Sequence, residues 1–214
     1  MTIILSLLTP VKNEEVNLSI IKKIIESSKN KNEYEWIFVD DHSTDNSWRI
    51  IEELVKKFEN IKLFKNSGKG KIEAINQCFK NAQGKHCKLV GGDDEINLDI
   101  VSYVRNLKNN ETLIHSAQIF DETKKKIVSD YYPPSQIIQN DLNSYLKNFT
   151  SCPSWNWIFP REVAKKFFPI PNLNYEDLYL SFCFKKFTKI NYLNKKDLYL
   201  YKQNSGQTYG NIMK

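Results

Sequence analysis

The sequence predicts an α/β protein with a mostly parallel sheet and helices on both of its faces. Short β-rich apolar runs alternate four times with amphipathic helical patterns in residues 1–95, and this alternation is typical of parallel sheets. Most of these runs end in polar or glycine residues, as buried strands do at a sheet edge. With 214 residues and a 41% hydrophobic fraction, the chain can bury a full core, so we expect one domain over residues 1–214.

The first strand is expected at residues 3–8, where Ile, Leu and Ser form an apolar run. Pro10 then interrupts the pattern. Asn13 is expected to cap the helix that follows, with Glu14 in its positive first turn. Apolar residues at helical spacing carry this helix to about Ser28.

The second and third strands are expected at residues 34–39 and 61–64. The helix between them is capped by one of three adjacent residues, Ser43, Thr44 or Asp45. A basic glycine loop, residues 66–71, follows the third strand and leads into a helix that we expect Gly84 to terminate.

The fourth strand, residues 87–90, ends in Gly91 and Gly92 and then in three consecutive acids that begin with Asp93 and Asp94. Glycine lets the backbone turn and leaves room for a ligand. Adjacent carboxylates repel each other unless a cation lies between them. The alternative is a solvated turn, in which adjacent acids are common.

Three of the four strands are followed by polar side chains that should gather at one rim. The carboxyl ends of parallel strands meet at the same edge of the sheet, where ligands bind. The side chains that we expect there follow the first, second and fourth strands: Asn13, Glu14, Asp40, Asp41, Asp93 and Asp94.

The second half, residues 96–214, has a different pattern. It predicts helices from about Asn97, at residues 142–149 and from about residue 175. It predicts strands at 112–120 and 126–128, which form a hairpin, and closing strands at 190–193 and 198–201. An aromatic segment at 151–160 leads into a short helix. Trp155 and Trp157 project the same way if their segment is a strand. They are either core residues or a wall on which a sugar stacks.

The composition excludes several classes. No apolar run approaches 20 residues, so we expect no transmembrane helix. The four cysteines have no metal-type spacing, and we expect reduced core thiols and a cytoplasmic protein. The net charge of +6 suits anionic partners such as nucleotides or the inner face of a membrane. The lysines are too dispersed to indicate nucleic acid.

Several motifs resemble the family 2 glycosyltransferases of the GT-A fold, over about residues 3–201. Residues 9–15 resemble the Pro-x-x-Asn-Glu opening of that family, and residues 39–47 match its Val-Asp-Asp-x-Ser-Thr-Asp-x-Ser segment. Residues 68–76 resemble its glycine loop and Ala-x-Asn helix. Residues 91–94 stand where the metal-binding Asp-x-Asp usually lies, and Glu176 with Asp177 resembles the pair that carries the catalytic base.

The resemblance implies a Rossmann-like GT-A fold with a nucleotide-sugar-binding half, residues 1–95, and a mixed acceptor-side half, residues 96–214. It implies an inverting transferase that moves a sugar from a nucleotide-sugar donor, a UDP-sugar first of all, to a hydroxyl of a glycan or lipid-linked acceptor. Bacterial cell-surface polysaccharide or lipooligosaccharide synthesis is the process implied, with peripheral contact at the inner membrane face allowed.

The residue roles that the resemblance implies fit the chemistry of such a transfer. A hard cation, Mg²⁺ or Mn²⁺, offsets the charge of the leaving diphosphate and needs only one or two protein carboxylates. A positioned carboxylate takes the proton of the acceptor hydroxyl. The residues are Asp177 as base with Glu176 beside it, Asp93 at the metal, Asp94 near the donor, Pro10, Asn13, Glu14, Asp40 and Asp41 at the nucleoside, and Lys69 or Lys71 at the phosphates.

The sequence departs from the family pattern at two places. Gly91 replaces the first acid of the Asp-x-Asp, and residues 201–206 lack the terminal His that often contacts the metal, though Gln203 or Asn204 could replace it. A catalytically silent nucleotide-binding relative therefore remains an alternative.

Two further alternatives fit less well. A sugar-nucleotide nucleotidyltransferase would need a glycine-rich loop straight after the first strand, and residues 9–15 contain no glycine. A phosphoacceptor receiver domain would be much shorter, and it would leave the aromatic second half without an explanation.

Overall fold

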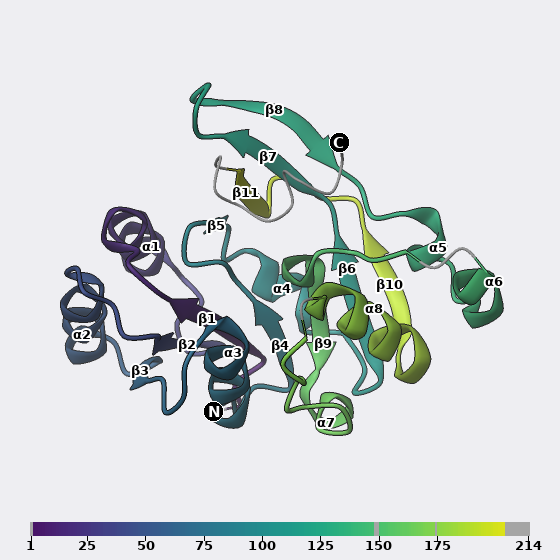
Figure 1. Ribbon diagram of the computed structural model, residues 1–214, viewed down its shortest axis with the longest axis horizontal. Helices are drawn as coiled ribbons and strands as arrows, with labels where there is room; N and C mark the ends of the chain where they lie inside the picture. The colour runs from purple at the N-terminus through teal and green to yellow at the C-terminus, as the bar shows by residue number, and fades with distance from the viewer. Residues whose placement is uncertain (1, 148–149, 174, 204–214) are drawn as a thin grey trace.

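The computed structural model describes residues 2–147, 150–173 and 175–203, which form two sheets and the helices around them (Figure 1). The large sheet has the strand order β10-β6-β9-β4-β1-β2-β3, and the small sheet has the order β5-β11-β7-β8. Only β9 runs antiparallel to its neighbours among the described strands of the large sheet. The predicted α/β class with a mostly parallel sheet is confirmed.

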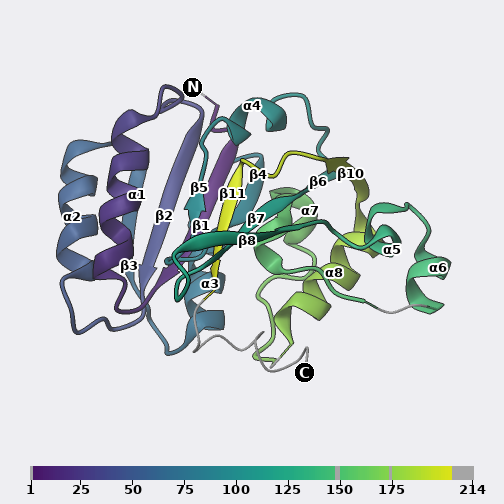
Figure 2. The ribbon, with the colours of Figure 1, turned by 90° about the horizontal axis from the view of Figure 1, so that it is seen from above.

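The strands of the large sheet are β1 (Leu5–Val11), β2 (Tyr34–Asp40), β3 (Ile61–Lys65), β4 (His86–Leu89), β6 (Glu111–His115), β9 (Trp157–Pro160) and β10 (Lys189–Leu193). Those of the small sheet are β5 (Glu95–Ile96), β7 (Ala117–Asp121), β8 (Lys126–Tyr131) and β11 (Tyr199–Gln203). The small sheet lies above the carboxyl ends of β1 and β4 in Figure 1 and crosses in front of the large sheet in Figure 2.

Helices cover both faces of the large sheet. One core contains residues of α1 (Glu15–Ser27), α2 (Ser47–Lys57) and α4 (Ile100–Val104). The opposite core contains residues of α3 (Lys71–Lys80), α5 (Ser135–Ile138), α6 (Leu142–Lys147), α7 (Arg161–Ala164) and α8 (Glu176–Phe187). A short 3₁₀ helix, η1 (Ser154–Asn156), precedes β9.

Strand alternation in β2 explains why both faces need helices. Trp36 and Phe38 are buried in the first core, whereas Ile37 and Val39 are buried in the second. Successive side chains of a strand point to opposite faces. A strand such as β2, which is buried at every position, is therefore stable only between two covered faces, as in other doubly wound sheets.

Some sequence predictions were wrong in detail. The predicted strand over 112–120 is two strands, β6 and β7, which separate at Ser116 into different sheets. The helix before Gly84 already ends at Lys80, and Gly84 instead packs so closely that a Cβ there would lie 2.6 Å from Ser6 Oγ. Phe149 of the predicted 142–149 helix lies outside the described residues. The hairpin is confirmed as β7–β8, and all four cysteines are free and buried.

Candidate active site

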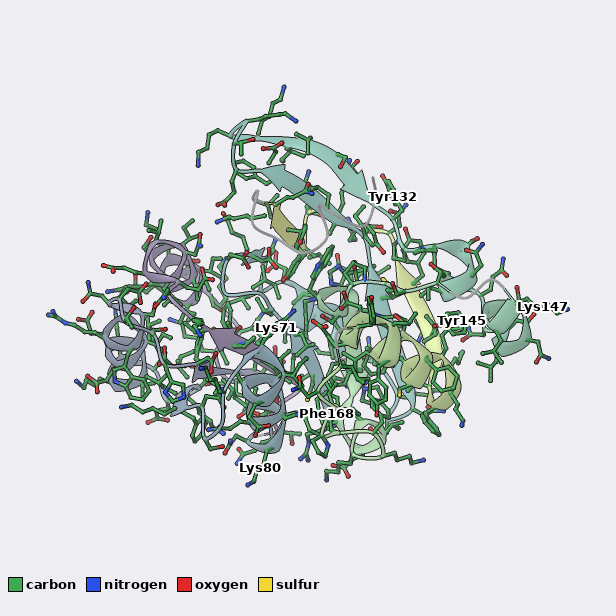
Figure 3. The ribbon with its side chains drawn as sticks, viewed as in Figure 1. Lys71, Lys80, Tyr132, Tyr145, Lys147 and Phe168 are labelled. Atoms are coloured by element: carbon green, nitrogen blue, oxygen red, sulfur yellow. The ribbon has the colours of Figure 1, made fainter. Side chains whose placement is uncertain are left out.

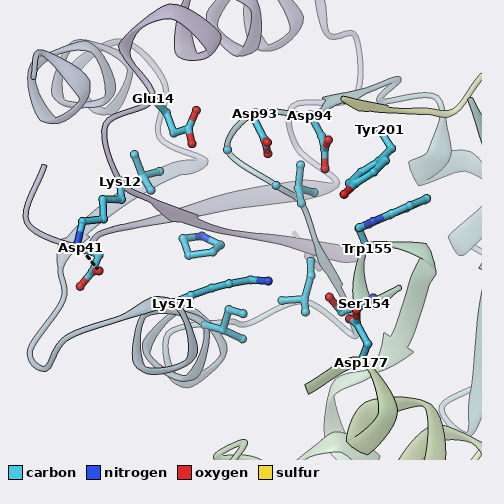
Figure 4. A pocket seen from close by; sticks show the side chains of 17 residues that line it. Lys12, Glu14, Asp41, Lys71, Asp93, Asp94, Ser154, Trp155, Asp177 and Tyr201 are labelled. Carbon is cyan, nitrogen blue, oxygen red and sulfur yellow. Dashed lines mark hydrogen bonds and ion pairs between the residues drawn. The ribbon is translucent and has the colours of Figure 1, made fainter. Parts of the chain in front are cut away.

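A pocket of about 410 Å³ opens at the carboxyl edge of the large sheet (Figure 4). It collects residues from nearly the whole chain, from the end of β1 to strand β11. Figure 4 shows the carboxylates of Glu14, Asp93 and Asp94 along one wall, Lys71 and Asp177 opposite them, and the rings of Trp155 and Tyr201 at one end. The other lining residues are Val11, Lys12, Ile75, Leu89, Val90, Gly91, Gly92, Pro10, Asp41 and Ser154.

The loops after β1 and β2 are joined by hydrogen bonds at this edge. Asn13 has a positive φ of 57°, and its Oδ1 accepts a hydrogen bond from the backbone N–H of Thr44 at 2.8 Å. The Glu15 amide donates to Asp45 Oδ2 at 3.1 Å, and the Glu14 amide donates to Ser47 Oγ at 2.8 Å. The sequence predicted that Asn13 caps α1, and this prediction is wrong, because the Asn13 side chain bonds to Thr44 in the other loop. The amides at the start of α1 donate instead to Asp45, in the second loop, and to Ser47, the first residue of α2.

Asp41 connects the glycine loop to the pocket. Its Oδ1 accepts hydrogen bonds from the Gly70 amide at 2.9 Å and from Asn66 Nδ2 at 2.7 Å, and Lys12 Nζ lies 3.4 Å from its Oδ2. Burial raises the pKa of Asp41, but these hydrogen bonds and the Lys12 ammonium outweigh burial and lower it below its ordinary value. Asp41 is therefore a fixed anion at neutral pH.

Asp94 is held by strand β11. Its Oδ2 accepts a hydrogen bond from the Tyr199 hydroxyl at 2.7 Å, and its Oδ1 accepts one from the Lys202 amide at 2.9 Å. Burial, and then the neighbouring Asp93 carboxylate, raise the pKa of Asp94 to about 7. A Cβ at Gly91 would lie 2.4 Å from Asp94 Oδ2, so this arrangement of the two acids requires a glycine there.

The acidic wall, defined here as Glu14, Asp93 and Asp94, offers carboxylate oxygens, the ligands that a hard cation prefers. Burial raises the pKa of Glu14, and the nearby Asp93 carboxylate raises it further, so these acids repel each other. Gly92 allows this approach, since a Cβ there would lie 3.0 Å from Glu14 Cγ. No three His, Cys, Asp or Glu side chains group as metal ligands among the described residues. A cation here would rely on one or two protein carboxylates and on ligand oxygens, as Mg²⁺ often does.

Asp177 faces the pocket from the first turn of α8. Its Oδ1 accepts a hydrogen bond from the Ser154 amide at 2.7 Å, which fixes its direction. Its neighbour Glu176 forms an ion pair with Lys71, Nζ to Oε1 at 2.7 Å. Burial lowers the pKa of Lys71, but Glu176, with Asp177 and Asp93, outweighs burial and raises it above its ordinary value, so Lys71 keeps its charge.

An aromatic wall, defined here as Trp155, Tyr199 and Tyr201, lies at one end of the pocket, which Trp155 and Tyr201 line and Tyr199 supports from behind. The Trp155 ring stacks on Tyr199 at 5.1 Å and on Tyr201 at 4.9 Å between centroids. The buried Lys88 supports the wall, because its Nζ lies 4.5 Å from the Tyr199 ring centroid and donates to the Trp155 carbonyl. The two tryptophans thus have different environments. Trp157 is fully buried in the core, whereas Trp155 lines the pocket.

The predicted site residues that line the pocket are Pro10, Glu14, Asp41, Lys71, Asp93, Asp94 and Asp177. Four others do not line it. Asn13 joins the two loops, Lys69 is exposed, and Glu176 pairs with Lys71. Asp40 is buried, with Oδ2 on the Ser43 amide and with no hydrogen-bond partner for Oδ1 among the described residues.

Sequence reasoning missed Ser154 and Tyr201 as pocket residues. Nothing in the local pattern marks Ser154, which acts through its backbone amide. Tyr201 depends on β11 pairing parallel to β7, which is about 80 residues away in the chain. The alternation of Tyr199 and Tyr201 in a closing strand was the only available signal.

A pocket at the carboxyl edge of a mostly parallel sheet is where α/β proteins bind nucleotides. A family model described as Glycosyl transferase family 2 matches residues 6–168. The chain belongs to this family.

Relatives with assigned activities cover parts of the chain. A Methanococcus voltae dolichyl N-acetyl-alpha-D-glucosaminyl phosphate 3-beta-D-2,3-diacetamido-2,3-dideoxy-beta-D-glucuronosyltransferase is 30% identical over 59% of this chain and 42% of its own length. A Bacillus spizizenii poly(ribitol-phosphate) beta-glucosyltransferase is 35% identical over 43% of this chain and 15% of its own. The chain thus spans less than half of either relative.

The fold is GT-A. S. aureus TarS 1–349 in complex with UDP-GlcNAc superposes with a TM-score of 0.74 at 20% identity, covering 98% of this chain and 61% of that one. At this identity the likeness establishes the fold. Among the described residues, no helix combines the length and apolar character that crossing a bilayer requires.

Proposed function

We propose that this chain is an inverting glycosyltransferase that moves a hexosyl group from a nucleotide-sugar donor, a UDP-sugar first of all, to a hydroxyl of a glycan or lipid-linked acceptor. The observation that carries the proposal is the placement of Asp177 and the acidic wall on opposite sides of one pocket. Family membership supports the reaction class. The named activities of the relatives, which include sugar transfer onto a dolichyl N-acetyl-alpha-D-glucosaminyl phosphate and onto poly(ribitol phosphate), support a cell-surface glycan or glycolipid acceptor.

The donor would lie with its nucleoside between Pro10 and Asp41 and its diphosphate toward Asp93. Lys71 would contribute a positive charge to the diphosphate, since its ammonium stays charged beside Glu176. Trp155 and Tyr201 would bound the sugar by ring stacking.

Asp177 would take the proton of the acceptor hydroxyl while that oxygen bonds to the anomeric carbon. The bond from that carbon to the diphosphate oxygen breaks in the same step, and the electron pair leaves with the nucleoside diphosphate. A single displacement from the opposite face inverts the anomeric centre. General base catalysis of this kind contributes typically about 10²–10⁴-fold.

The acidic wall would hold a divalent metal, Mg²⁺ or Mn²⁺, through Asp93 and with Glu14 close by. When bound, the metal would neutralise charge on the leaving diphosphate. Asp94 is already engaged by Tyr199 and Lys202, so we assign it to shaping the wall rather than to direct ligation.

Nucleotide binding with and without metal tests the proposal. Calorimetry of wild type with UDP, GDP and dTDP, each with Mn²⁺, Mg²⁺ or EDTA, should show binding of one nucleotide that EDTA removes. Asp93→Ala should lose the metal-dependent part, whereas Asp99→Ala, an exposed acid outside the pocket, should not. A nucleotide at about a hundred times its Kd should also add about 2.7 kcal/mol of stability.

The alternative outcomes separate the competing functions. Nucleotide binding that neither EDTA nor Asp93→Ala weakens would favour a metal-independent enzyme or a catalytically silent relative. The silent relative is the second candidate function, because Gly91 replaces the usual first acid of the Asp-x-Asp motif. UDP release from UDP-GlcNAc and other UDP-sugars would then distinguish an enzyme from a binding protein. Absence of any nucleotide binding would refute the proposed function.

A further inference from the structure

The segment that leads into α8 is fixed to α3 at both of its ends. At its start, the Ile170 amide donates to Asn76 Oδ1 at 2.6 Å, and Asn76 Nδ2 donates to the Ile170 carbonyl at 2.9 Å. At its end, Lys71 Nζ donates to Glu176 Oε1 at 2.7 Å. One helix therefore fixes both sides of the segment that delivers Asp177.

The residue type at position 76 matches this task. A primary amide is a side chain that offers a donor and an acceptor together, so it can satisfy both the N–H and the C=O of one residue. Ile170 is 2% exposed, so losing these bonds would leave buried backbone groups unpaired. Asn76 itself does not line the pocket, and the Ala-x-Asn pattern of α3 otherwise has no assigned role.

Helix α3 is a firm support for such a contact. Its buried side chains, Ala74, Ile75, Cys78 and Phe79, belong to the core beneath it. Phe79 also stacks on Phe168, with centroids 3.9 Å apart, just before the fixed segment. Figure 3 shows Lys71 and Lys80 at opposite ends of the helix, with Lys71 toward the centre of the molecule.

We infer that Asn76 is a positioning residue for Asp177, holding the entry to α8 so that the carboxylate faces the pocket. This inference rests on the proposed function, in which Asp177 is the base. The Ser154 amide orients the carboxylate from η1, and Asn76 fixes the chain that carries it. A shift of about 1 Å in a reacting group can cost about 100-fold in rate, so the effect of Asn76 falls on kcat and not on donor binding.

The kinetic test compares wild type, Asn76→Ala, Asn76→Asp and Asn81→Ala. Asn81 lies just after the same helix, and its Nδ2 donates to the Gln77 carbonyl within α3, so it is a matched control. For UDP release from a UDP-sugar, Asn76→Ala should lower kcat by about 10–100-fold, with the donor KM and the Kd for UDP within twofold of wild type. Asn76→Asp keeps the hydrogen-bond acceptor and loses the donor, so its kcat should lie between those of wild type and Asn76→Ala. Asn81→Ala should match wild type.

A second comparison separates positioning from a general loss of structure. In an Asp177→Asn background, Asn76→Ala should cause no further loss of kcat, because its effect passes through Asp177. A loss of equal size in both backgrounds would overturn the inference. An equal effect of Asn81→Ala, or a rise in KM with unchanged kcat, would also overturn it.

Amide hydrogen exchange tests the contact without relying on turnover. In Asn76→Ala the Ile170 amide should exchange about tenfold faster or more, together with residues 175–178, while the amides of β1 keep the wild-type rate. Unchanged exchange at Ile170 would overturn the inference even if wild type binds UDP and releases it from a UDP-sugar. Failure of wild type to bind any nucleotide would refute the proposed function, and the role of Asn76 for a base would fall with it.

Discussion

Replacing Asp94 by Asn should make the protein more stable at neutral and higher pH. The Asp94 carboxyl is 2% exposed and sits against Asp93. Burial first, and Asp93 second, raise its pKa from 3.8 to about 7. Because the folded-state value is above the unfolded value, the stability linked to this group is fully present below pH 3.8. It is lost as the pH rises through about 7.

The size of the effect follows from the shift. A rise of about three pKa units corresponds to about 4 kcal/mol between the extremes, of which about 3 kcal/mol is lost between about pH 4.5 and about pH 8. Asn keeps the shape and still accepts from the Lys202 amide, but it has no charge to bury. The free energy of unfolding of Asp94→Asn relative to wild type should therefore rise by about 3 kcal/mol over this range.

Urea unfolding followed by tryptophan fluorescence, in EDTA at several pH values, measures this difference. Asp99→Asn, which changes an exposed acid in the turn after β5, is the matched control and should show no such pH trend. If the difference between Asp94→Asn and wild type is the same at both ends of the range, ionisation of the buried carboxylate costs no stability, which would refute the prediction.

Three further predictions follow from the pocket. Trp157→Ala should lower the free energy of unfolding by about 3–5 kcal/mol in urea titrations, because the side chain is fully buried. Trp155→Ala should lower the free energy of unfolding less. In calorimetry, Trp155→Ala should weaken UDP-sugar binding more than UDP binding. Gly91→Ala should weaken metal-dependent UDP binding by about tenfold or more, since its Cβ would displace the carboxyl of Asp94; unchanged binding would show that the acidic wall adapts. Lys71→Met should raise the Kd for UDP by about tenfold and leave uridine binding unchanged, and an equal effect on both would place Lys71 away from the phosphates.

Much of the donor side could be predicted because its signals are local. The β1, β2 and β4 runs are short and largely apolar, and polar or glycine residues follow each of them. Parallel strands must bring those ends to one edge, so the gathering of Glu14, Asp41 and Asp93 follows from the alternation alone.

The rest depends on contacts between distant parts of the chain. Asn13 looked like a helix cap, yet it adopts a positive φ and binds Thr44 of another loop. The aromatic wall requires β11 to enter the small sheet between β5 and β7. The Asn76 contact joins residues 94 positions apart, and no spacing rule predicts such a partner.

The position of β11 also determines when the site can exist during synthesis. The chain leaves the ribosome from its N-terminus. Strands β1 to β4 can therefore pair with one another long before Tyr199 and Tyr201 have been synthesised. Until β11 docks against β7, Asp94 lacks the Tyr199 hydroxyl and the Lys202 amide that hold it. A nascent chain could thus carry a folded donor-side sheet while Asp94 stays unfixed, and the last described strand would complete the pocket.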